Sequence, residues 1–84
     1  MEKEFVLVDL NPVQKKLLLK YAQYVISDEE TKSDLKDRSI LWVRFSGGTI
    51  YQLKGELSYR LNRCRSSRTM ELLDELISHL EYYE

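Results

Sequence analysis

Four arginines lie within nine residues of the chain: Arg60, Arg63, Arg65 and Arg68. A guanidinium group can bind a phosphate through two parallel hydrogen bonds, and a tyrosine ring can stack on a nucleobase. Both kinds of residue occur between positions 44 and 68, which predicts a binding patch for a phosphodiester backbone or for an acidic protein surface. The predicted patch consists of Arg60, Arg63, Arg65, Arg68, Arg44, Lys54, Tyr51 and Tyr59.

The distribution of charge leaves an alternative for these arginines. Residues 1–37 carry a net charge of −2, residues 38–68 of +6 and residues 69–84 of −5, in a chain whose total is −1. The carboxylates of the final stretch follow Arg68 by one or two helical turns and can neutralise the cluster within the fold: Glu71, Asp74 and Glu75. The isoelectric point of about 5.9 and the absence of any RNP, GXXG, helix-turn-helix or zinc-finger pattern argue against nucleic acid.

The residue types that support catalysis or metal binding are few and scattered. His79 is the only histidine and Cys64 the only cysteine, so the sequence offers neither a zinc ligand set nor a cysteine–histidine pair. Glu75 stands four residues before His79, which is the spacing of a solvated pair on one helix face. We therefore predict no catalytic, cofactor-binding or metal-binding residue, no cofactor, and a protein that is not an enzyme.

Length and composition predict a single small domain over residues 1–84. Hydrophobic residues make up 43% of the chain and charged residues 32%, a balance typical of globular proteins rather than of disordered or membrane-spanning ones. No window approaches the ~18 apolar residues of a membrane span, and a single cysteine fits a reducing compartment. These features predict a cytoplasmic protein without a membrane partner.

The elements that must position the charged residues begin with a strand and a helix. Residues 4–8 contain β-forming side chains in a run too short for a helix, which predicts a strand. Asn11 as N-cap, Pro12 at the first helical position and Gln14 in a capping box predict a helix over residues 12–26. Residues 27–39 carry eight charges, which predicts a charged flexible loop.

Gly47 and Gly48 separate two runs of β-forming residues in the centre of the chain. Because glycine readily adopts the positive φ of a tight turn, this pattern predicts a β-hairpin over residues 40–54. Helical spacing of apolar residues then predicts a short helix over residues 56–64 and a final helix over residues 70–83. The predicted class is α+β, with a small antiparallel sheet packed against three helices.

In chain order the predicted elements are β-α-β-β-α-α, with the central hairpin as the sheet and the 4–8 strand as a further member of it. Both faces of the hairpin and most sides of the first helix are apolar, which is more than a chain of this size covers easily. Trp42 is expected in the core, with an interface as the alternative.

These observations predict a small non-catalytic protein-interaction or regulatory domain. Its expected partner is another protein or a second copy of itself, because association would cover the surplus apolar surface. The alternative prediction is a nucleic-acid-binding protein that uses the arginine cluster on the helix after the hairpin.

Overall fold

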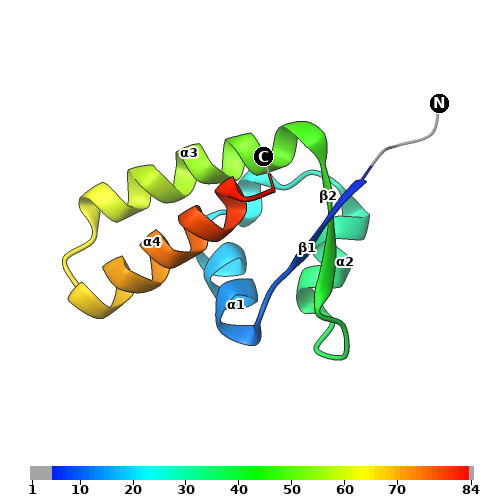
Figure 1. Cartoon of the computed structure of the whole chain (residues 1–84), viewed down its shortest axis with the longest axis horizontal. Coiled ribbons are helices and arrows are strands. Elements are labelled where there is room, and N and C mark those ends of the chain that lie inside the picture. The colour runs from blue at the N-terminus through cyan, green and yellow to red at the C-terminus, as the bar shows by residue number, and fades with distance from the viewer. Residues whose placement is uncertain (1–4, 84) are drawn as a thin grey trace.

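The computed structural model of the chain describes residues 5–83, which form two strands, four α-helices and one 3-10 turn (Figure 1). In chain order the elements are β1 (Phe5–Asp9), α1 (Pro12–Tyr21), η1 (Gln23–Val25), α2 (Glu29–Lys36), β2 (Trp42–Ser46), α3 (Gly47–Arg63) and α4 (Ser67–Glu81). The predicted α+β class is confirmed. Within the described part of the chain, no helix combines the length and the apolar character needed to cross a bilayer.

The sheet consists of β1 and β2, which pair antiparallel although they lie far apart in the sequence. The predicted 4–8 strand is therefore confirmed as β1, except for Glu4, which lies outside the described residues. Val8 lies opposite Val43, and both are fully buried together with Phe45 on the inner face. Because side chains alternate along a strand, Leu7 and Trp42 belong to the opposite, outer face.

Helix α1 begins where its sequence signals place it. The Asn11 side chain accepts a hydrogen bond from the backbone N–H of Gln14 at 2.8 Å, and the Gln14 side chain accepts one from the backbone N–H of Asn11 at 3.0 Å. The helix ends at Tyr21 rather than at residue 26. Val25 and Ile26 are β-branched and weaken a helix at this point, and the 3-10 turn η1 redirects the chain so that Ile26 is buried.

The prediction of a loop over residues 27–39 was wrong, because helix α2 occupies residues 29–36. Glu29 and Glu30 lie in its first turn and Lys36 in its last, where each charge complements the helix dipole. One face of α2 is buried although it is largely polar: Thr31, Asp34 and Leu35. The sequence prediction failed because two of these three buried side chains are polar.

The prediction of a hairpin over residues 40–54 was also wrong. Neither Gly47 nor Gly48 has a positive φ, and the chain passes from β2 directly into helix α3, which merges the predicted second strand with the predicted 56–64 helix. Ile50 and Leu53 come three residues apart and Leu57 four residues later, and all three are buried. This spacing fits one face of a helix as well as a strand, and β1 takes the place beside β2 that the hairpin would have filled.

Helices α3 and α4 lie side by side along one side of the molecule and are joined by a short turn at its end (Figure 1). The final helix begins at Ser67, three residues earlier than predicted, because the Ser66 side chain accepts a hydrogen bond from the backbone N–H of Thr69 at 3.3 Å. The buried residues of α4 complete the core: Leu73, Leu76, Ile77 and Leu80.

Candidate functional site

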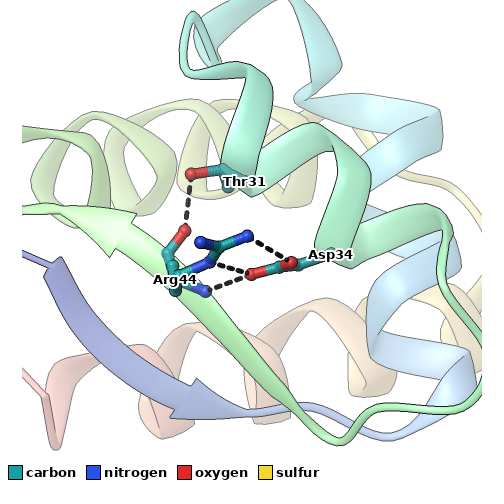
Figure 2. Close-up of polar contacts among 3 residues, drawn as sticks. All are labelled: Thr31, Asp34 and Arg44. Carbon is teal, nitrogen blue, oxygen red and sulfur yellow. Dashed lines mark hydrogen bonds and ion pairs between the residues drawn. The ribbon is translucent and has the colours of Figure 1, made fainter.

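Arg44, which the predicted patch includes, forms an ion pair with a carboxylate of helix α2. Its Nε donates to Oδ2 of Asp34 at 2.9 Å and its Nη2 donates to Oδ1 at 3.0 Å (Figure 2). This bidentate pair lowers the pKa of the Asp34 carboxyl, chiefly through the Arg44 side-chain hydrogen bonds. The charge of Arg44 is therefore largely compensated by helix α2.

Side chains of helix α2 also form hydrogen bonds with the backbone N–H and C=O groups of Arg44. The Arg44 N–H donates to Oδ2 of Asp34 at 3.0 Å, and the Thr31 hydroxyl donates to the Arg44 carbonyl at 2.5 Å (Figure 2). Both backbone groups lie on the edge of β2 that does not face β1, where a third strand would otherwise bind. Two side chains thus replace a strand, and an exposed sheet edge of the kind that promotes aggregation is covered at this position.

Arg60 is compensated as well. Its Nε donates to Oε1 of Glu56 at 3.0 Å across one turn of α3. Tyr24, the central residue of η1, approaches the same pair, and its hydrogen bond to Glu56 raises the pKa of the Tyr24 hydroxyl and lowers that of the Glu56 carboxyl. This residue of the predicted patch therefore takes part in packing η1 against α3.

Three other arginines of the patch remain exposed at the turn between α3 and α4: Arg63, Arg65 and Arg68. We call these three residues the arginine tip. The guanidinium carbon of Arg63 lies 4.5 Å from the centre of the Tyr59 ring, a cation–π contact that leaves the charge accessible. Among residues 5–83, no arginine of the tip forms an ion pair with a carboxylate of α4. The alternative in which carboxylates of the final helix neutralise these arginines is therefore not observed among residues 5–83.

The remaining patch residues, Tyr51 and Lys54, lie in the first half of α3. Arg63 lies twelve positions after Tyr51, which is about 18 Å along a helix. Tyr51 is exposed and borders a shallow hollow of about 250 Å³ between α3 and α4. Figure 1 places β2, which carries Arg44, at the other end of the molecule from the α3–α4 turn. The eight predicted residues therefore occupy three separate places.

His79 and Cys64 both contact other residues of the fold. His79 Nε2 lies 2.6 Å from the Asp9 carbonyl oxygen, and the Tyr83 hydroxyl donates to the Asp9 carboxylate at 2.5 Å. These contacts join the end of α4 to the end of β1, so His79 pairs with Asp9 rather than with Glu75. Cys64 is the C-cap residue of α3, and its Sγ lies 3.6 Å from the Ser66 carbonyl oxygen. Residues 5–83 contain no group of three side chains suited to hold a metal ion.

The outer face of the sheet is exposed in the described part of the chain, residues 5–83. Trp42 is 53% exposed and Leu7 is 52% exposed, so the expectation of a buried Trp42 was wrong. The two-stranded sheet has only one face toward the core, because the helices that follow β2 pack on its inner side. We call the exposed pair, together with the half-buried Phe5, the sheet face.

A third surface was not predicted from the sequence. Two hollows of about 520 and 440 Å³ meet at Leu19, between α1 on one side and α2 with its following loop on the other. Among the described residues that line them, none is acidic and six are cationic: Lys15, Lys16, Lys20, Lys32, Lys36 and Arg38. Residues 1–37 are acidic in sum, so a charge count by region hides this basic groove. The repeated spacing of four residues, 16 to 20 and 32 to 36, was the available signal.

Comparison of the chain with protein-family models, with curated proteins and with solved structures finds no match. Three surfaces of the described chain are candidates for binding: the sheet face, the arginine tip and the basic groove.

Proposed function

We propose that this chain is a small non-catalytic interaction domain that associates with a second copy of itself through the sheet face. The observation that carries the proposal is the exposure of Trp42 and Leu7 on a sheet whose other face forms the core. Tryptophan is one of the residue types enriched among side chains that dominate binding energy, because it buries a large area at small entropic cost. A domain of this size has little reason to leave such a residue in water unless a partner covers it.

The charges near the sheet face favour a second copy as the partner. Arg44 is held by Asp34, and the Asp9 carboxylate is held by Tyr83 and approached by His79 at 3.4 Å. Two copies related by a two-fold axis present the same surface to each other, so uncompensated charge would repel. Here Asp34 compensates the charge of Arg44, and the Asp9 carboxylate already accepts a hydrogen bond from Tyr83. The apolar side chains of the two copies can therefore meet with an acid, Asp9, at their border.

The experiment is sedimentation equilibrium from low micromolar to several hundred micromolar protein, combined with Trp42 fluorescence. We expect a monomer–dimer equilibrium and a blue shift of the emission with rising concentration, both lost in Trp42→Glu. Tyr51→Glu is the matched control, because it adds the same charge at another exposed aromatic residue. A monomer at every concentration, with unchanged emission, would contradict the proposal.

The arginine tip supports a second candidate, the binding of single-stranded nucleic acid. Its specific observation is that three exposed guanidinium groups and the Tyr59 ring gather at one turn with no carboxylate partner among the described residues. Three phosphate contacts predict a log–log slope of affinity against salt of roughly −2 to −3. Binding of a labelled oligothymidine that is independent of salt, or unaffected by replacing all three arginines with glutamine, would remove this candidate.

A further inference from the structure

The basic groove between α1 and α2 combines an apolar floor with a cationic rim. The floor is formed by residues from both helices and from the segments that flank them: Leu10, Leu19, Leu35, Ile40 and Leu41. Leu10 and Leu35 are almost fully buried and make the floor firm, whereas Leu41 is 63% exposed at its border. An apolar side chain from a ligand would therefore find a preformed surface and an accessible leucine to cover.

The rim consists of two rows of lysines. Lys16 and Lys20 are four residues apart on α1, and Lys32 and Lys36 are four residues apart on α2. Residues at this spacing lie on one side of a helix, about 6 Å apart along its axis. The two rows thus border the same groove from opposite walls.

Lys15 adds a buried charge at one end of the groove. Its residue is 6% exposed, and its ammonium donates to the carbonyl oxygens of Asp37, at 2.7 Å, and of Ile40. An ammonium group has three donors, and these two acceptors are uncharged. The nearby Asp34 and Asp37 carboxylates are occupied by Arg44 and by Ser39. The protein therefore tolerates a positive charge here without giving it a direct carboxylate partner.

The rim charges are also weakly compensated. Lys32 reaches Glu29 only at 4.0 Å, and Lys20 lies 5.2 Å from the centre of the Tyr21 ring. Within residues 5–83, Lys16, Lys36 and Arg38 have no ion-pair partner. Like charges lining a concave, partly apolar surface repel one another and concentrate a positive potential there. A ligand with carboxylates would relieve that repulsion.

We propose that this groove binds an acidic segment of a partner protein, which places apolar side chains on the leucine floor and carboxylates along both lysine rows. An amphipathic helix has the required pattern, with apolar residues at i, i+3, i+4 and i+7 and acids beside them. The larger hollow by itself, at about 520 Å³, falls within the range of established ligand sites. This proposal goes beyond the self-association above and uses none of the sheet-face residues.

The shape and composition of the groove favour a peptide over the other polyanions. An anionic membrane is flat, whereas these apolar residues form the floor of a depression between two helices. Single-stranded nucleic acid needs aromatic side chains on which bases stack, and among the described lining residues of the two hollows only Tyr24 is aromatic. The charges fit all three ligands, and the leucine floor distinguishes the peptide.

The test uses fluorescence anisotropy with a fluorescein-labelled peptide of about twelve residues, the length of three helical turns. Its leucines follow the i, i+3, i+4, i+7 pattern and the other positions are Glu or Asp. We expect binding that weakens with salt, and about a tenfold loss of affinity in the double variant Lys16→Glu, Lys36→Glu. One control peptide has serine in place of leucine and another has glutamine in place of glutamate, and both should bind at least about tenfold more weakly.

Matched protein variants separate the site from net charge and from folding. The double variant Arg65→Glu, Arg68→Glu makes the same change in net charge at the arginine tip, outside the groove, and should lose much less affinity than the groove variant. Lys16→Arg with Lys36→Arg should also retain binding, and circular dichroism checks that every variant is folded. All binding measurements are repeated in the Trp42→Glu background, which is expected to be monomeric. Peptide binding in that background is independent of the sheet face, so the two proposals can fail separately.

Three outcomes would overturn the proposal. The first is no binding of the acidic peptide up to about 1 mM. The second is equal loss of affinity in the groove variant and in the Arg65, Arg68 variant, which would make the effect one of net charge alone. The third is binding, dependent on Lys16 and Lys36, of phosphatidylserine vesicles or of oligothymidine in place of the peptide.

Discussion

Replacing Asp34 with alanine is expected to destabilise the fold by about 2 to 3 kcal/mol. The Asp34 carboxylate accepts three hydrogen bonds from one residue, Arg44, at 2.9 to 3.0 Å. The variant leaves the Arg44 N–H at the sheet edge without an acceptor and the guanidinium without its counter-charge. Hydrogen bonds to a charged group contribute about 1.5 to 3 kcal/mol. The Arg44 side chain is 43% exposed, so water replaces part of the loss and the effect stays below that of a fully buried pair.

The assay is urea unfolding followed by far-UV circular dichroism, with thermal unfolding alongside. For a domain of this size, 1 kcal/mol corresponds to about 4 to 8 °C in Tm, so Asp34→Ala should lower Tm by roughly 8 to 24 °C. Asp34→Asn keeps one oxygen that can accept from the Arg44 N–H and should cost less. Thr31→Val removes only the bond to the Arg44 carbonyl and should cost about 1 kcal/mol.

Two results would refute the reasoning. One is an Asp34→Ala variant whose free energy of unfolding lies within about 0.5 kcal/mol of the parent, the range of ordinary surface substitutions. The other is additivity of Asp34→Ala and Arg44→Met, because two residues joined by three hydrogen bonds should show a coupling energy in a double-mutant cycle.

The same carboxylate predicts a dependence of stability on pH. Arg44 lowers the pKa of Asp34 below its ordinary value of 3.8 in the folded state. A group with a depressed folded-state pKa stabilises the protein above its unfolded pKa, and this contribution is lost as the pH falls through the folded value. The free energy of unfolding should therefore decrease below about pH 4, and decrease less steeply in Asp34→Asn.

Three further predictions concern other elements. Gly55→Ala should stabilise the protein by about 0.5 to 1 kcal/mol, because glycine weakens a helix interior and an added Cβ meets no atom within 4 Å; a lower urea midpoint would contradict this. Asn11→Ala should destabilise it by about 1 kcal/mol through loss of the α1 cap, and Asn11→Ser should restore most of that loss. Tyr83→Phe should raise the pKa of Asp9, followed by carboxyl NMR, because the Tyr83 hydrogen bond is the main cause of its depression; an unchanged titration would show that the hydroxyl does not bind there in solution.

The sequence predicted those parts of the fold whose signals are local. The capping box of Asn11 and Gln14 positions the start of α1 through bonds between residues three apart, and no distant contact is required. The apolar spacing of the last helix likewise predicts α4 to within three residues at its start. Arg60 could also have been assigned to Glu56, because the two stand four residues apart on the same helix.

The errors share a different physical cause. Ile50, Leu53 and Leu57 fit both a strand after a glycine turn and a helix, and the choice was made by β1, which pairs with β2 from the other end of the sequence. Helix α2 was missed because Thr31 and Asp34 are buried only where the backbone of Arg44 offers them hydrogen bonds. That edge exists only in the folded chain.

The candidate surfaces also depend partly on local sequence and partly on tertiary contacts. The amino-acid order alone determined that arginines cluster near residue 65 and that lysines recur at intervals of four in two early segments. Packing of α1 against α2 decided that the two lysine rows face one groove, and the pairing of strands distant in sequence decided that Trp42 lies outside the core. Local hydrogen bonds and helix periodicity act over three or four residues, whereas burial and the meeting of like charges depend on which elements become neighbours.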